Sequence, residues 1–412
     1  MKSAPRVSAV FWGGFALLSA CSSLKGSFRS ALPTDPLRIQ SLGIQQITTE
    51  PRAENPGILR EQPWQWRGRF ASGAPAQSFV EPILASSDDV LVSSIGGGLE
   101  LRRVRSGQKI WSLPVAIGVA SKPLILGTSV VVAGLDAQVR RLNLTTGAVE
   151  WTQRISAEST GGIAASGGRL FVSSADDSLW ALDEKSGEVA WTYRRPGTSA
   201  QTQWSLRGQA VPQVSVDGGR LFLGFSDGYF VALDAQNGQT VWERNFDRAG
   251  RFKDADLSPV LSRDGLTLFL PLVDGDLIAV RTSNGSSLWS VPDAGGATPL
   301  VDEDEGALYA VTLSGQVQRV SLRTTAVEWT TGLSAGAPST PVALGARHVV
   351  LSTSHEGLAV LDRKSGQVVW RKRYGYGPLA APAFDGERLL VLSARNRLEL
   401  FRVEERKPAH GG

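Results

Sequence analysis

The segments Ser106-Gly107-Gln108-Lys109-Ile110-Trp111 and Thr146-Gly147-Ala148-Val149-Glu150-Trp151 share one frame, in which a glycine precedes a tryptophan by four residues. The frame returns along the chain, and its tryptophans are Trp111, Trp151, Trp191, Trp242, Trp289, Trp329 and Trp370. Successive tryptophans are 40, 40, 51, 47, 40 and 41 residues apart. In the sixth copy Thr325 stands where the other copies have glycine. A period of this length indicates a repeat architecture, in which neighbouring units bury one another's apolar faces.

Each repeat unit carries the signals of four short strands. Proline lacks the N–H that a central strand needs, and it stands where the first strand begins in seven units: Pro82, Pro123, Pro212, Pro259, Pro299, Pro341 and Pro382. After the second strand, a turn such as Asp227-Gly228 supplies the positive φ of a tight hairpin. The third strand, for example 229–233, leads through the frame's glycine into the tryptophan strand. Four antiparallel strands in about 40–45 residues are typical of a β-propeller blade.

The number of blades follows from the last unit, which is incomplete. After Pro382 the chain has strand patterns at 388–394 and 397–403 but no fourth strand with a tryptophan. A strand pattern is available upstream, at 64–68, before the first complete unit. We therefore predict an all-β, eight-bladed propeller of four-stranded antiparallel blades, in which the N-terminal strand completes the last blade and removes its open edge. A seven-bladed ring is the alternative.

The N-terminus has the pattern of an export signal. Lys2 and Arg6 precede an apolar stretch at 7–18, which is too short for a membrane-spanning helix and typical of a signal peptide. It ends in Leu18-Ser19-Ala20-Cys21, which resembles a bacterial lipobox, so we expect residues 1–20 to be removed and Cys21 to be lipidated. An ordinary secretory signal with an incidental cysteine is the alternative. No Asp follows Cys21 as an inner-membrane retention signal, so the resemblance implies anchoring on the periplasmic side of the outer membrane.

The predicted organisation is a signal peptide at 1–20, a lipidated cysteine and flexible tether at 21–62, the propeller at 63–403 and a disordered tail at 404–412. The tether is polar and contains four prolines, which favour an extended linker. Outside the signal, no apolar run is long enough for a membrane-spanning helix.

Composition argues against several kinds of site. The 412 residues include one Cys and three His, so an intramolecular disulfide is excluded and a His- or Cys-based metal centre is not expected. The 43 basic and 39 acidic residues are interspersed without a basic block, which argues against nucleic-acid binding. Acidic pairs such as Asp176-Asp177 are interpreted as solvated turns. The sequence predicts no cofactor and no metal.

Two departures from the repeat length mark a candidate contact surface. The long spacings place extra residues at 196–210 and 245–258, each between one blade's last strand and the next blade's first strand. Both connections therefore emerge on the same face, one blade apart, and loops on a rigid scaffold are common binding sites. The first offers Trp204, Leu206 and Arg207, residue types that often anchor interfaces, and the second offers Asp254 and Asp256. Alternatively, the apolar pair caps the ring and the charges are solvated.

The Gly-x-x-x-Trp frame resembles the quinoprotein-type, or PQQ-like, propeller repeat. This resemblance implies that the seven tryptophans pack between adjacent blades rather than form a ligand cage. It also raises the possibility of a quinone-dependent dehydrogenase. That family commonly has a vicinal disulfide, which a single Cys excludes, and its chains are usually longer than this one.

The lipobox, polar tether and eight-bladed propeller together resemble the BamB family, the propeller lipoproteins of the outer-membrane β-barrel assembly machinery. The most specific matches are Trp204-Ser205-Leu206-Arg207-Gly208, similar to the family's Leu-Ser-Leu-Arg-Gly loop, and Asp254-x-Asp256 one blade later. The resemblance implies that these loops contact the periplasmic POTRA domains of BamA. The residues implied are Leu206, Arg207, Asp254 and Asp256, with Trp204 at a position where the family has an aliphatic residue. The long tether and Thr325 depart from the family pattern.

The function implied by this resemblance is that of a scaffold without enzymatic activity, anchored to the outer membrane and facing the periplasm. Such a protein would bind BamA-like POTRA domains and other subunits of the assembly complex, and its candidate partners include nascent outer-membrane proteins during insertion of β-barrels. Two alternatives stay open: a periplasmic propeller that binds a small molecule or polysaccharide in its central channel, and a relative of the PQQ-dependent dehydrogenases.

Overall fold

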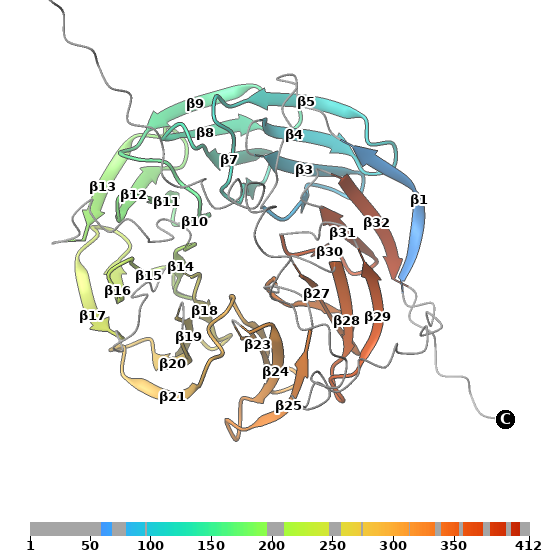
Figure 1. Cartoon of the computed structure of the whole chain (residues 1–412). Coiled ribbons are helices and arrows are strands. Elements are labelled where there is room, and N and C mark those ends of the chain that lie inside the picture. The colour runs from blue at the N-terminus through green and yellow to red at the C-terminus, as the bar shows by residue number, and fades with distance from the viewer. Residues whose placement is uncertain are drawn as a thin grey trace, which may run out of the picture. The chain divides into compact units, whose positions relative to one another are not determined.

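The computed structural model describes residues 59–403, apart from 68–79, 95–96, 196–209, 247–256, 273–274, 313, 334–338, 354–356, 374–379 and 393–396. All of these residues belong to one compact unit, Asn55–Gly412. Within the described ranges every regular element is a β-strand, so none of them forms a helix that could cross a membrane. The strands form eight separate four-stranded sheets, which are the blades of a propeller (Figure 1).

The strands follow the chain from blade to blade. Blade 1 has β2 (Ile83–Leu84), β3 (Asp89–Ser94), β4 (Gly98–Arg103) and β5 (Lys109–Pro114), and blade 2 has β6 (Leu124–Leu126), β7 (Ser129–Ala133), β8 (Gln138–Asn143) and β9 (Val149–Arg154). Blade 3 has β10 (Ile163–Ser166), β11 (Arg169–Ser174), β12 (Ser178–Asp183) and β13 (Val189–Arg194), and blade 4 has β14 (Gln213–Val214), β15 (Arg220–Gly224), β16 (Tyr229–Asp234) and β17 (Thr240–Asn245). Blade 5 has β18 (Val260–Leu261), β19 (Thr267–Pro271), β20 (Leu277–Arg281) and β21 (Ser287–Val291), and blade 6 has β22 (Leu300–Asp302), β23 (Ala307–Val311), β24 (Gln316–Ser321) and β25 (Val327–Gly332). Blade 7 has β26 (Val342–Leu344), β27 (His348–Thr353), β28 (Gly357–Asp362) and β29 (Val368–Arg373), and blade 8 has β30 (Ala383–Phe384), β31 (Arg388–Leu392), β32 (Arg397–Val403) and β1 (Leu59–Arg67).

The position of a strand within its blade determines how far it is buried. In blade 2, every residue of β7 is buried, because both faces of a middle strand lie against neighbouring blades. From Glu150 onward, the outermost strand β9 alternates between exposed and partly buried residues, since only one of its faces packs inward. A β-bulge between Arg141 and Leu142 lies opposite the start of β9, and a bulge recurs at the same place in blades 1 to 7.

The core is divided into eight apolar clusters, each between two successive blades. Between blades 1 and 2, for example, Leu99 and Leu101 pack against Val130 and Val132. The same arrangement continues around the chain to the contact between blades 7 and 8. An eighth cluster then joins the last blade to the first: Val90, Val92 and Val104 pack against Leu390, Leu392, Leu398 and Leu400. These contacts close the ring.

The N-terminal strand completes the last blade, as the sequence predicts. β1 pairs antiparallel with β32, with Trp66 opposite Leu398 and Leu59 opposite Val403. A register shift between Glu61 and Gln65 interrupts the ladder. Because β1 covers the outer edge of β32, blade 8 has four strands like the others. The count of eight blades is confirmed, and the seven-bladed alternative is wrong.

Hydrogen bonds between turns define two faces of the ring. Leu144 N donates to Thr128 O at 2.8 Å, so the turn after β8 lies beside the turn between β6 and β7; we call this side the turn face. Ile155 N donates to Ala137 O at 3.0 Å, so the end of β9 lies beside the turn between β7 and β8; this opposite side is the connection face. Since all blades share this topology, every link from one blade to the next starts and ends on the connection face.

Candidate functional site

The partner-contact residues predicted from the sequence fall in two segments whose structure is not described. Trp204, Leu206 and Arg207 lie within 196–209, and Asp254 and Asp256 lie within 247–256. The predicted lipidation site, Cys21, also lies outside the described residues. What the structure does describe is the frame from which the two segments leave and to which they return.

The returning ends of the two segments are joined to each other. The first link leaves β13 after Arg195 and returns at Ala210, whose carbonyl oxygen accepts a 2.8 Å hydrogen bond from Ser173 Oγ of blade 3. The second leaves β17 after Phe246 and returns at 257. Val211 N then donates to Ser258 Oγ at 2.9 Å. The described ends of both links therefore lie on the connection face of blades 3 to 5, one blade apart.

Arg195, the last described residue before the first link, is held by three side chains of blade 4. Its Nε donates to Asp227 Oδ2 and its Nη1 to Glu243 Oε2, both at 2.7 Å, and its guanidinium carbon lies 3.7 Å from the centroid of the Tyr229 ring. Only 8% of the side chain is exposed. Burial opposes the charge, but the hydrogen bonds to the two carboxylates outweigh it and raise the pKa of Arg195 above its ordinary value. The start of the first link is thus fixed to the blade that carries the second.

Arg195 differs from the apolar residue that four other blades have at its place in the repeat, whereas blade 5 has the exposed Asp293 and blade 7 has Tyr374 there. The position four residues after the tryptophan is Val115, Ile155, Phe246 and Leu333 in four other blades. The side chains of Val115, Ile155 and Leu333 are buried, and Phe246 packs against the cluster between blades 4 and 5. An apolar residue therefore satisfies the fold at this position, and the buried ion pairs occur where the first link begins. Sequence reasoning missed Arg195, since a charged residue at this position does not by itself indicate burial: Asp293 occupies it in blade 5 and is exposed.

A second polar link joins blades 3 and 4 on the same face. Asp177 accepts hydrogen bonds from both the backbone N–H and the hydroxyl of Ser226. Asp177 is buried and has a positive φ of 58°, which non-glycine residues adopt mainly in tight turns. The interpretation of Asp176-Asp177 as a solvated turn is therefore wrong for Asp177. Its carboxylate is buried because the turn between β15 and β16 packs over it, 49 residues further along the chain.

The seven frame tryptophans lie on the outermost strands and pack in or against the clusters between blades. For five of them, Nε1 donates to a backbone carbonyl of the next blade: Trp111 to Leu144, Trp151 to Glu184, Trp191 to Ala235, Trp242 to Thr282 and Trp329 to Arg363. The frame glycine of the next blade lies directly on the indole ring, because a Cβ at Gly147 would be 2.6 Å from Trp111 Cδ2. At the equivalent place above Trp289, Thr325 adopts a φ of 60°.

The charged groups described at this site are used within the protein. Within the described ranges, no group of three or more His, Cys, Asp and Glu side chains could hold a metal ion. Arg195 is saturated by carboxylates and Asp177 by Ser226, so both act within the frame. The frame thus fixes the described ends of the two links on the connection face.

Comparison with known proteins identifies relatives of most of the repeat region. A family model described as outer membrane protein assembly factor BamB matches residues 104–331 and 329–409. Outer membrane protein assembly factor BamB of Yersinia pestis is 26% identical over 291 residues, which cover 66% of this chain and 62% of that protein. A polyvinylalcohol dehydrogenase of Sphingopyxis is 33% identical over 114 residues, covering 24% of this chain and 17% of that protein. The crystal structure of BamB from Moraxella catarrhalis superposes with a TM-score of 0.69 at 18% identity, covering 84% of this chain and all of that one.

Proposed function

The chain belongs to the family of outer membrane protein assembly factor BamB, and from this premise we propose that it is a scaffold subunit of the machinery that inserts β-barrel proteins into the outer membrane. In this role it binds the periplasmic POTRA domains of BamA and performs no chemistry itself. Lipidation at Cys21 holds it on the periplasmic face of the outer membrane, and residues 22–58 form the tether between the lipidated cysteine and β1.

One observation carries the proposal. The returning ends of the two links that depart from the repeat length are joined by the Val211–Ser258 hydrogen bond, and the start of the first is held by the contacts of Arg195. A rigid base reduces the ordering that binding requires, so loops on such a base bind a partner more tightly. We assign the contact to Leu206, Arg207, Asp254 and Asp256, with Trp204 beside them.

The test is a pull-down of the full chain, in detergent, with the POTRA domains of BamA from the same organism. Arg207→Ala and Asp254→Ala should each reduce the retained chain, because each removes a charged group from the proposed interface. Arg263→Ala is the matched control. Arg263 is exposed, lies in the turn between β18 and β19 on the turn face, and pairs with Asp304 of the turn between β22 and β23. Binding that is equal in all four proteins would refute the assignment of the contact.

The proposed role in insertion includes direct contact with nascent strands. Each sheet ends on its outer side in a strand with one hydrogen-bonded neighbour: β5, β9, β13, β17, β21, β25, β29 and, in blade 8, β1. Such an edge offers unpaired backbone groups to an extended segment, which can add to the sheet as a further strand. Photo-crosslinking from outer-strand positions to a β-barrel precursor would test this contact. Crosslinks confined to the connection face would contradict it.

The enzymatic alternative has its own test. A PQQ-dependent dehydrogenase relative would change the absorption spectrum of added PQQ on binding, whereas a scaffold would leave the spectrum unchanged. Retention of the POTRA domains together with an unchanged PQQ spectrum is the result we expect.

A further inference from the structure

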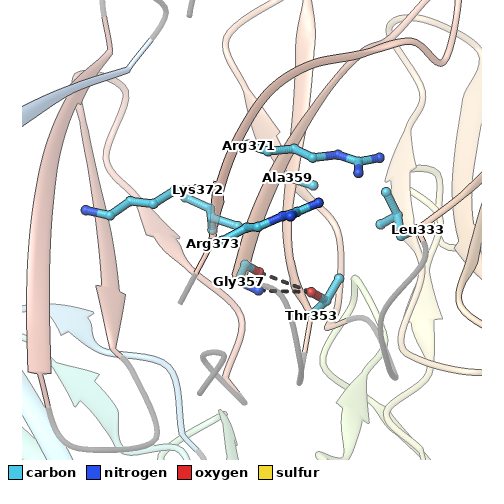
Figure 2. Close-up of a pocket in the computed structure, with 8 residues that line it drawn as sticks. Leu333, Thr353, Gly357, Ala359, Arg371, Lys372 and Arg373 are labelled. Carbon is cyan, nitrogen blue, oxygen red and sulfur yellow. Dashed lines mark hydrogen bonds between the residues drawn. The ribbon is translucent and has the colours of Figure 1, made fainter. Parts of the chain in front are cut away.

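The outermost strand of blade 7 carries a pair of basic side chains on one of its faces. Arg371 and Arg373 lie two residues apart on β29, and Figure 2 shows both extending to the side of Leu333 while Lys372 extends to the other side. Across the sheet they face Ala359 and Gly357, which are too small to cover them. A shallow hollow beside the pair is lined by Leu333, Thr353, Gly357 and Ala359.

Neither arginine of this pair has a carboxylate partner among the described residues. Other arginines do: Arg141 pairs with Glu150 of its own blade at 2.7 Å and with Glu184 of the next blade at 3.3 Å, and Arg363 pairs with Asp302 of blade 6. Lys372 on the opposite face is neutralised by Glu399 at 3.0 Å. The face that carries Arg371 and Arg373 therefore keeps two positive charges at the edge of the sheet, one half-buried and one exposed.

The interface between blades 3 and 4 shows which residues the fold accommodates at the place where Arg371 lies. Counting from the tryptophans, Leu333 takes the place of Arg195, Arg371 the place of Glu243, and Gly357 the place of Tyr229. In the earlier interface these positions are occupied by an arginine, a carboxylate and the ring on which the arginine stacks. Between blades 6 and 7 the ring is absent, because Gly357 replaces the tyrosine, and leucine replaces the arginine. Arg371 occupies the position of the carboxylate. This location therefore supplies the cationic half of a guanidinium–carboxylate pair.

We propose that β29 binds an acidic segment of another polypeptide in an extended conformation, through two carboxylates at positions i and i+2. The spacing fits, because alternate residues of adjacent strands lie on the same face with a rise of about 3.3 Å per residue. β29 is a sheet end, so its outer backbone groups can pair with the incoming strand. Opposite charges that face each other across two strands stabilise the pairing. This inference rests on the proposed use of an outer blade edge and is independent of BamA binding by the two links.

A charged edge also protects a sheet against aggregation, and that role needs repulsion alone. A binding site differs from protection in two measurable respects. It selects a ligand by the position of its charges, and its preference reverses when the charges of the site are reversed. The experiment therefore measures selection and its reversal.

The probe is a fluorescently labelled nine-residue peptide of Thr and Val with one central Glu-Val-Glu, titrated with the full chain while polarisation is recorded. A second peptide has Lys-Val-Lys at the centre. The chain should bind the glutamate peptide and not the lysine peptide. The double variant Arg371→Glu with Arg373→Glu should bind the glutamate peptide about tenfold more weakly, because two attractive pairs become repulsive, and should gain affinity for the lysine peptide.

Arg154→Glu is the matched control, since Arg154 occupies the position of Arg373 on the outermost strand of blade 2. It should leave the affinity for the glutamate peptide within about twofold, because surface charges that far from the site are screened at physiological salt. Loss of binding in this control, or equal binding by the double variant with intact circular dichroism, would overturn the proposal. Absence of binding by the unmodified chain would do so too. Displacement of the peptide by inorganic phosphate or by phosphatidylglycerol vesicles would assign the site to phosphates and refute the peptide ligand. None of these outcomes depends on whether the POTRA domains bind.

Discussion

The guanidinium carbon of Arg195 lies 3.7 Å from the centroid of the Tyr229 ring, and the two residues belong to different blades. Stacking orients the guanidinium plane so that two of its nitrogens reach Asp227 and Glu243 at 2.7 Å each. A lysine could not provide the same contacts, because its ammonium group is a point charge without a planar fork. This contact holds the start of the first long link against the blade that carries the second.

Replacing Arg195 by leucine tests how much this contact contributes. Leu333 fills the equivalent position between blades 6 and 7, so we expect Arg195→Leu to fold. The free energy of unfolding should fall by about 2 kcal/mol, less than the usual cost of breaking a buried ion pair, because Asp227 and Glu243 retain access to water. Urea denaturation followed by circular dichroism measures the change. Binding of the POTRA domains should also weaken under conditions in which the variant is fully folded.

Arg363→Leu is the control for this loss of binding. Arg363 is similarly buried and pairs with Asp302, but it lies on the turn face, away from the two links. We expect it to reduce stability by a similar amount and to leave POTRA binding unchanged. If both variants weakened binding equally, the effect of Arg195 would be one of general stability and not of positioning.

Thr325 offers a substitution that should stabilise the protein. Its φ of 60° lies in the left-handed region, which is strained for a β-branched residue, and the six other copies of the frame have glycine at this position. Thr325→Gly should raise the free energy of unfolding by about 1 kcal/mol, because it removes that strain. The denaturation midpoint should shift upward without a change in slope. A lower midpoint would show that the methyl or hydroxyl group makes a compensating contact.

The reverse change at a sister turn is the matched experiment. Gly366 has a φ of 71°, and a Cβ there would lie 2.6 Å from Trp329 Cδ2. We expect Gly366→Thr to cost about 2 kcal/mol or more, since it adds both backbone strain and a steric conflict with the indole. Equal stability of this variant and the unmodified chain would contradict the account given for Thr325.

The fold could be predicted from the sequence because its signals are local and repeated. Each Gly-x-x-x-Trp frame contains the turn and strand that it specifies, and eight blades follow from counting the frames and supplying the missing strand from 64–68. Arg195 and Asp177 could not be placed in this way. Arg195 is buried by Tyr229 and Glu243, and Asp177 by Ser226, all from the next blade and more than 30 residues away. Local sequence marks both as surface charges, and only packing between blades makes them part of the frame.

Trp242 tests the contribution of the frame tryptophans. Its indole is buried beside Phe222 and Phe230, and Nε1 donates to Thr282 O at 2.9 Å. Trp242→Ala should lower the free energy of unfolding by about 3–5 kcal/mol, since it empties a large buried volume. Trp242→Phe keeps most of the ring and should cost about 1–3 kcal/mol, largely because the Thr282 carbonyl loses its donor.

Trp180 on β12 supplies the control for the hydrogen bond. Its Nε1 is buried and has no partner within the part of the chain that the structure describes. Trp180→Phe should therefore be nearly neutral, or stabilise the protein slightly, because it removes an unsatisfied donor. If Trp180→Phe and Trp242→Phe had the same cost in thermal denaturation, ring volume and not the hydrogen bond would explain both.

The turns before the tryptophan strands give the stability of the protein an acid dependence. Asp362 is partly buried, which opposes its ionisation, but hydrogen bonds from Ser365 and Lys364 outweigh burial and lower its pKa. A carboxylate with a lowered pKa in the folded state stabilises the fold above its unfolded pKa, near 3.9 for Asp, and loses this contribution as the pH falls toward the folded pKa. The free energy of unfolding should thus be flat near neutral pH and decline below about pH 4.

The chain itself contains the uncharged version of this turn. In blade 2, Asn143 takes the place of Asp362, and its Oδ1 accepts hydrogen bonds from Thr145 N at 3.1 Å and Thr146 N at 3.0 Å. Asp362→Asn should therefore preserve the turn while making the decline below pH 4 shallower, and Asn143→Asp should make it steeper. Urea denaturation at pH 7 and at successive pH values down to about 3 measures both slopes. The two substitutions are reciprocal, so the decline below pH 4 should change in opposite directions in the two variants if these carboxylates cause it. A change in the same direction in both variants would contradict the explanation.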